Sequence, residues 1–201
     1  MKNTDGGGWR KELYELVRKS CENYDRHENV EMGQTWNYHV LPVVKNAIML
    51  CERYGGDVLV AEVAALFHDF AVTTDTDKYY ETHHIMSGEL AEPILREYGF
   101  EQDFIDKVKR VIFAHRASVT KDKFSPEEIA LADADGVTHI ENAFEIIVWR
   151  GNRGETVEQA NAFVKRKIQK TFAKLSAETK EYIRDRFDAV MKILYSPPTE
   201  G

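Results

Sequence analysis

The sequence predicts an all-α protein, and three observations lead to this prediction. Apolar residues recur at spacings of three and four in successive segments, which is the period of an amphipathic helix. Ser and Thr stand where several of these segments begin, and Gly stands where several end. No convincing run alternates between apolar and polar residues, as a half-buried strand would. We therefore expect helices that pack on helices.

The first half of the chain shows two amphipathic segments and one strongly apolar segment. The first expected helix covers residues 9–24, and the second begins at the turn that contains His39 and ends before Gly55. Residues 57–70 are apolar nearly all round, which indicates the most buried helix. The polar segment 71–82 is predicted to be a loop that lies over the end of that helix.

The second half of the chain carries clear signals for helix starts. Ser125 can cap a helix, Pro126 suits its first position, and Glu128 completes a capping box. Thr156 and Gln159 form the same capping-box pattern further along the chain. The expected helices are 83–98, 101–115, 125–150, one that begins at Thr156, and 176–195.

Length and composition are typical of one globular domain over residues 1–201. Within it we distinguish an N-terminal helix at 9–24, a core at 36–150 and a C-terminal helical extension at 155–195. The net charge of −7 argues against partners such as a nucleic-acid polymer or an anionic membrane. Only two cysteines, no CxxC motif and no secretory leader predict a reduced, cytoplasmic protein.

The adjacent pair His68-Asp69 ends the apolar segment and is the first candidate for chemistry. Taken alone, the pair equally fits a capped helix end with an ordinary salt bridge. An unpaired carboxylate in so apolar a setting costs several kcal/mol, and a divalent cation is a natural partner for it. His39 lies upstream, and Asp133 and Asp135 lie downstream. Two imidazoles and two carboxylates would bind one divalent cation and leave positions open for water and substrate.

The residues alone leave two choices for the last carboxylate ligand. Asp133 falls on the apolar stripe that contains Ile129 and Val137, whereas Asp135 falls off it. Helical geometry therefore favours Asp133. A helix distorted near Gly136 would allow Asp135 to face inward instead.

The ordered set His…His-Asp…Asp resembles the HD superfamily of metal-dependent phosphohydrolases. The chain looks most like the small single-domain bacterial and archaeal hydrolases of that superfamily, whose substrates are poorly defined. The resemblance implies an HD-domain helical bundle, to which this chain adds two C-terminal helices. The resemblance rests on residues 38–40, 64–69 and 131–135, and residues 83–91 and 111–116 also match the family pattern.

The resemblance implies that His39, His68, Asp69 and Asp135 bind the metal. The family pattern favours Asp135 because an apolar residue follows that Asp two places on, and Asp133 is kept as the alternative. The expected cofactor is a divalent metal ion, one or two per chain, chosen from Mn, Mg, Co, Ni, Zn and Fe.

Relatives with two metals use extra histidines for the second ion, and the Asp of the HD pair then bridges both. His83, with His84 as its fallback, and His115 stand at the matching places. The expected catalytic residues are Asp69, His115 and Arg116. Further expected phosphate contacts are Lys121 and Lys123, beside the alternative of a solvated basic loop.

The resemblance predicts a hydrolase that acts on a small phosphorylated molecule, with nucleotides the first class to test. Two alternatives stay open, a di-iron oxygenase with the same ligand set and a non-catalytic binding protein that contains metal. The sequence does not predict the oligomeric state.

Overall fold

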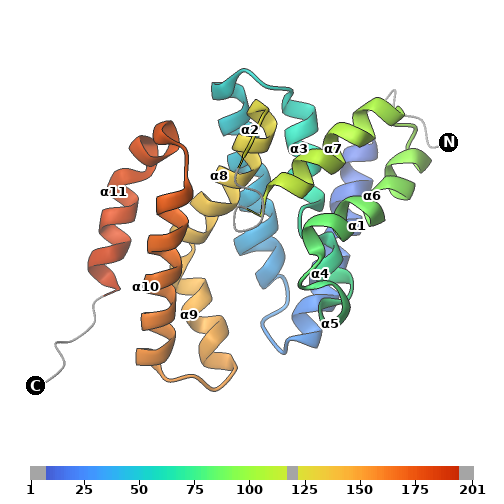
Figure 1. Ribbon diagram of the computed structural model, residues 1–201. Helices are drawn as coiled ribbons and strands as arrows, with labels where there is room; N and C mark the ends of the chain where they lie inside the picture. Colours follow the sequence, from blue (N-terminus) through green and yellow to red (C-terminus); the bar gives the residue numbers. More distant parts are fainter. Residues whose placement is uncertain (1–7, 117–121, 195–201) are drawn as a thin grey trace, which may run out of the picture. The chain divides into compact units, whose positions relative to one another are not determined.

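The structure is a computed structural model that describes residues 8–116 and 122–194 (Figure 1). The described residues form helices and contain no strand, which confirms the all-α prediction. The chain divides after Asp135 into two compact units, each with its own apolar core. The single domain expected from the sequence stays a prediction. None of the described helices has the length and apolarity needed to cross a membrane.

The first unit contains the segments that carry the candidate site. It begins with α1 (Gly8–His27), η2 (a π-helix, Trp36–Val40), α2 (Leu41–Tyr54) and α3 (Val58–Phe67). It continues with α4 (Phe70–Thr74), α5 (Thr76–Tyr79), α6 (His83–Glu97), α7 (Gln102–Ala114) and the first part of α8 (Pro126–Glu141).

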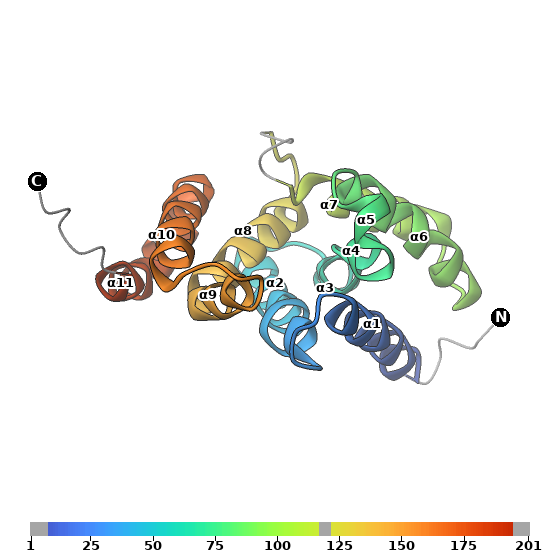
Figure 2. The ribbon, with the colours of Figure 1, turned by 90° about the horizontal axis from the view of Figure 1, so that it is seen from below.

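Helix α3 lies at the centre of this unit and packs against α1, α2, α6 and α7 (Figure 2). Every residue from Val60 to Phe67 is buried, which confirms the prediction of a helix surrounded by protein. The Asp57 carboxylate caps this helix by accepting hydrogen bonds from the Leu59 and Val60 amides at 3.1 and 3.3 Å. The site at the end of α3 is therefore attached to the best-packed element of the unit.

One charged residue, Glu62, is buried inside the apolar run of α3. Its carboxylate accepts hydrogen bonds from the Arg10 guanidinium at 3.0 Å and from the Tyr14 hydroxyl at 3.1 Å. Both partners lie on α1, so the pair compensates the buried charge and also joins α1 to α3.

The segment 71–82 is not the plain loop that its polarity predicted. It contains the short helices α4 and α5, separated at Asp75. Asp75 caps α5 by accepting from the Lys78 amide at 3.2 Å, and the Thr74 hydroxyl donates to the Phe70 carbonyl at 2.7 Å. These short-range bonds stabilise local turns that apolar periodicity does not reveal.

The second unit contains the rest of α8, then α9 (Ala143–Asn152), α10 (Val157–Lys174) and α11 (Ala177–Ile193). The single helix expected over 125–150 is wrong, because Asn142 interrupts it with a φ of −106° and a ψ of 31°. Asn competes for backbone hydrogen bonds and favours such breaks. The capping box of Thr156 and Gln159 is confirmed, with bonds of 3.0 and 3.3 Å.

Gly136 offers a test of packing in the second unit. A methyl group at this position would lie 2.7 Å from Leu175 Cδ2 and 3.1 Å from Thr171 Cγ2. We expect Gly136→Ala to lower the free energy of unfolding by about 1–3 kcal/mol, measured by urea denaturation. Gly151→Ala is the matched control, because nothing lies within 4 Å of its added methyl group and it should be neutral or stabilising. Equal stability of the two variants would contradict the tight contact.

Candidate metal centre

Six side chains of the first unit converge from η2, the end of α3, the start of α6, the end of α7 and α8. They form two groups, in each of which the candidate ligand atoms lie within 4.8 Å of one another. We call these groups the His39 triad and the Asp69 triad. The His39 triad consists of His39, His68 and Asp135, and the Asp69 triad consists of Asp69, His83 and His115.

The Asp69 carboxylate also contacts the imidazoles of the His39 triad, so it connects the two groups. Its Oδ2 atom is 3.1 Å from His39 Nε2 and 3.3 Å from His68 Nε2. Its Oδ1 atom is 3.7 Å from His83 Nε2 and 3.8 Å from His115 Nε2. Each oxygen therefore faces a different pair of imidazoles, which is the arrangement expected of a carboxylate that bridges two cations.

Three of the imidazoles are oriented by backbone carbonyls. The Nδ1 atoms of His68, His83 and His115 lie 2.7, 2.6 and 2.5 Å from the carbonyl oxygens of Ala65, Tyr80 and Ile112. A carbonyl only accepts, so Nδ1 must carry the proton in each case. When such a ring is neutral, its Nε2 lone pair is directed at Asp69 and its neighbours, as metal-binding histidines require.

The charges in the two triads are strongly coupled. Burial tends to raise the pKa of Asp69, but the charge of His68 and hydrogen bonds from His39 and His68 hold it well below its usual range. Burial disfavours protonation of His68, yet the carboxylates of Asp69 and Asp135 raise its pKa to about 9. Without a metal, the ionised carboxylates thus draw a proton onto His68, and a divalent cation would supply the same positive charge.

The pKa of His115 is shifted in the opposite direction from that of His68. Its burial and the nearby charge of His68 lower its pKa to about 4. The ring is therefore neutral at neutral pH, and its Nε2 atom keeps a lone pair that can be donated to a cation.

The backbone at His68-Asp69 explains how two neighbouring residues face one centre. Adjacent side chains on a helix diverge by about 100°, so both can face one centre only if the helix ends or bends there. This is confirmed, because α3 ends at Phe67 and Asp69 has a φ of −110° and a ψ of 15°. The chain turns between α3 and α4, and both side chains reach the cluster.

His39 is positioned by a π-helix and by the loop that precedes it, and the sequence did not predict either feature. It lies on the π-helix η2, a form that occurs often at functional sites. The preceding loop is fixed by Asp25, which is fully buried and accepts from the Gly33 amide at 2.8 Å, the Thr35 amide at 3.1 Å and the Thr35 hydroxyl at 2.5 Å. Asp25 is therefore a positioning residue for the segment that carries His39. Its only signal in the sequence is a carboxylate just before a polar loop with Gly33.

The two candidate carboxylates on α8 point in different directions. Asp135 belongs to the His39 triad, with its Oδ1 atom 3.8 Å from His39 Nε2. Asp133 is buried, as its stripe indicated, but accepts a hydrogen bond from the Tyr54 hydroxyl at 3.1 Å. Asp135 reaches the imidazoles without a distortion near Gly136, because α8 continues as an α-helix through that residue. Residues two apart on a helix diverge by about 200°, so one carboxylate faces α2 and the other faces the imidazoles.

The histidine next to His83 lies outside both triads. His84 is buried, its ring is 5.6 Å from that of Phe113, and its Nδ1 atom has no hydrogen-bond partner among the described residues. Burial, together with the charges of Arg116 and His83, lowers the pKa of His84. The geometry thus places His83, and not His84, beside Asp69.

Arg116 lies at the rim of the centre, directly after His115. Its guanidinium donates to the Glu81 carbonyl at 2.5 Å and to Glu81 Oε2 at 3.1 Å. Arg116 is thereby tied to the chain just before His83. Lys123 is half-buried, and Lys121 lies outside the described residues.

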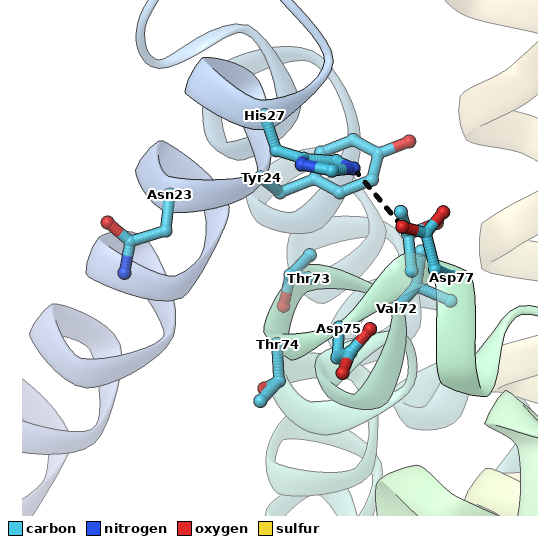
Figure 3. Close-up of a pocket in the computed structure, with 9 residues that line it drawn as sticks. Asn23, Tyr24, His27, Val72, Thr73, Thr74, Asp75 and Asp77 are labelled. Carbon is cyan, nitrogen blue, oxygen red and sulfur yellow. Dashed lines mark ion pairs between the residues drawn. The ribbon is translucent and has the colours of Figure 1, made fainter.

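The chain between Asp69 and His83 also borders a small cavity of about 240 Å³ against the end of α1 (Figure 3). Its lining is polar, and His27 Nε2 lies 3.9 Å from Asp77 Oδ2 across it. His27 belongs to neither triad.

Comparison with known proteins adds to this geometry. The chain is similar to a predicted HD superfamily hydrolase from an uncultured Thermotogales bacterium, with a TM-score of 0.62 and 22% identity over 92% of this chain and 88% of that one. It is also similar to Bacillus subtilis YpgQ, whose structure contains ADP, with a TM-score of 0.63 and 18% identity over 92% of this chain and 93% of that one. At these identities the likeness shows the fold alone.

No curated protein matches the sequence. The family profile described as HD domain matches residues 37–140, which is more than half of the chain and includes every member of both triads. The chain therefore belongs to the HD domain family.

Proposed function

We propose that this protein is a metal-dependent phosphohydrolase with two divalent cations, and that its substrate is a small phosphorylated molecule of the nucleotide class. The observation that carries the proposal is the position of the Asp69 carboxylate, with one oxygen toward His39 and His68 and the other toward His83 and His115. The ADP in the structure of YpgQ supports nucleotides as the first class to test.

The donor set fits transition metals better than magnesium. The two triads offer four imidazoles and two carboxylates, and imidazole suits Zn, Fe and Ni, whereas carboxylates and water suit Mg. His39, His68 and Asp135 would hold one cation, His83 and His115 the other, and Asp69 both. When bound, such cations lower the pKa of water to about 7 and stabilise the charge on a phosphoryl group under attack.

Arg116 is the residue best placed to orient a phosphorylated substrate. A guanidinium binds phosphate through paired hydrogen bonds, and this one stands beside His115. Its bond to the Glu81 carbonyl fixes the side chain, while the bond to the Glu81 carboxylate can be exchanged for a substrate oxygen. Phosphoryl transfer depends mostly on such alignment and on charge stabilisation.

The first test is metal content and phosphate release. We expect about two equivalents of transition metal by elemental mass spectrometry, and release of phosphate or pyrophosphate from at least one nucleotide in a panel. His68→Ala and Asp69→Ala should lose metal and at least about 100-fold of the activity, since even outer-shell partners of ligands cost 10- to 100-fold. His27→Ala is the matched control and should keep both. Full metal occupancy in the His68 and Asp69 variants would contradict the site.

The choice between the α8 carboxylates gives a second prediction. Asp135→Asn should reduce metal content, because it removes a charged ligand of the His39 triad. Asp133→Asn should keep the metal and at most lower stability, by about 1 kcal/mol, through its bond to Tyr54. Metal loss in the Asp133 variant alone would move the ligand to that residue.

Arg116→Gln tests the phosphate contact. A hydrogen bond to a charged group contributes about 1.5–3 kcal/mol, so kcat/KM for a phosphorylated substrate should fall by about 10- to 100-fold, with metal content unchanged. Arg96→Gln is the control, because Arg96 pairs with Glu92 within α6. An unchanged kcat/KM in the Arg116 variant would remove this residue from the substrate site.

A di-iron oxygenase is the second candidate, and the same imidazole-rich donor set favours it. Metal content separates the two functions. Two equivalents of iron, with an absorption spectrum that changes on exposure to oxygen and no phosphate release, would favour the oxygenase.

A further inference from the structure

A second, larger cavity lies in the first unit, away from both triads. It has a volume of about 500 Å³, which is within the range of small-molecule binding sites. It is formed by the beginnings of α3 and α8, the side of α7 and the residues just before α8. The side chains that matter here are Val60, Lys107, Arg110, Val111, Phe124 and Glu127.

The carboxylates around this cavity are engaged with the backbone. Glu127 Oε1 accepts from the Asp57 amide at 2.6 Å, and Glu128 Oε2 accepts from the Phe124 amide at 2.8 Å. The Asp57 carboxylate caps α3. Partial burial tends to raise the pKa of Glu127, but hydrogen bonds from Ser125 and the Asp57 amide, together with the charge of Lys107, lower it.

The two cations of the cavity are not engaged in this way. Lys107 and Arg110 are exposed, and neither side chain makes a hydrogen bond or a salt bridge with any residue that the structure describes. The charge of Lys107 acts on Glu127 without such a direct contact. Lys107 and Arg110 lie three residues apart on α7, so they are neighbours on one face of the helix. This face therefore presents two cationic groups that remain available to an anion.

The rest of the lining is apolar and includes one highly exposed ring. Val60 and Val111 form buried walls, whereas Phe124 is 87% exposed. An aromatic ring left in water at the edge of a cavity offers a stacking surface to a flat ligand.

The cavity is separate from the metal centre, although the same helices build both. Along α3, α7 and α8, one residue of the cavity precedes one residue of the triads by eight positions, and the triad residue directly follows the last residue of α3 and of α7. Eight residues correspond to about 12 Å along a helix. The pairs are Val60 and His68, Lys107 and His115, and Glu127 and Asp135.

We propose that this cavity is a second binding site, for a nucleotide-like anion whose phosphates contact Lys107 and Arg110 and whose base stacks on Phe124. The site is independent of the proposed hydrolase activity, because none of its lining residues belongs to either triad. The ligand is either a second molecule of the substrate class or a separate effector with the same chemistry.

Binding of ADP to the full chain in the presence of EDTA, measured by isothermal titration calorimetry, tests the proposal. EDTA removes the contribution of bound cations to ADP binding, so His68→Ala, which lacks a metal ligand, should bind ADP under these conditions as the wild type does. The double variant Lys107→Gln/Arg110→Gln should bind ADP at least about tenfold more weakly, because two charge-assisted contacts are lost. Circular dichroism should be unchanged, since both residues are exposed.

The control for overall charge is Lys11→Gln/Lys45→Gln, which changes two exposed lysines elsewhere and lowers the net charge equally. It should leave ADP binding unchanged. Phe124→Ala should weaken ADP by about fivefold or more but leave binding of pyrophosphate unchanged, because pyrophosphate has no ring to stack.

Three results would overturn the proposal. The wild type could fail to bind ADP at millimolar concentration, the two double variants could lose ADP affinity equally, or His68→Ala could lose ADP binding. A comparison of ADP with nucleotides that the enzyme hydrolyses and with nucleotides that it does not would then separate a substrate from an effector.

Discussion

Asp69 carries a charge that lies among four imidazoles, and the arrangement of the first unit around it follows from the need to balance that charge. The carboxylate is held ionised, and its two oxygens are within 3.8 Å of Nε2 atoms from four separate segments. An ionised group in such a setting destabilises the fold unless positive charge stands next to it. A proton on His68 supplies part of this charge, and a divalent cation supplies more. Because the ionised carboxylate needs positive charge beside it, the site destabilises the fold when no cation is bound. For the same reason the site binds a cation strongly.

The ends of helices provide the means to orient the ligands. The last carbonyls of a helix lack partners within it, and side chains near the end can take them. His68 and His115 follow the ends of α3 and α7 and bond to carbonyls of their last turns, while His83 bonds to the carbonyl of Tyr80, which follows α5. Each bond satisfies a carbonyl and fixes an imidazole at once. The centre therefore forms where several helices end, and the packing of α3 keeps those ends in place.

The sequence predicted the helical class, and its resemblance to the HD superfamily implied the residues of both triads, with Asp133 and His84 as alternatives. It predicted less of how the surrounding segments hold these residues. Helix period and capping signals are local, so α3, α10 and the segment break at His68-Asp69 could be predicted. The role of Asp25 depends on a loop that folds back onto it, and the turn at Asn142 depends on local backbone bonds. The choice between Asp133 and Asp135 required tertiary structure, since an apolar stripe indicates what faces the core and not what faces a polar cluster.

The ligand set alone does not distinguish hydrolysis from oxygen chemistry, because both can use imidazoles and carboxylates around two cations. The group that approaches the cations decides the reaction. Arg116 stands at the rim, and its guanidinium already binds a carboxylate, that of Glu81. A carboxylate and a phosphate present the same paired oxygens to a guanidinium, so the rim of this site is suited to an anion. An anionic substrate held there by its phosphate would present that group to the cations, and this favours the hydrolase.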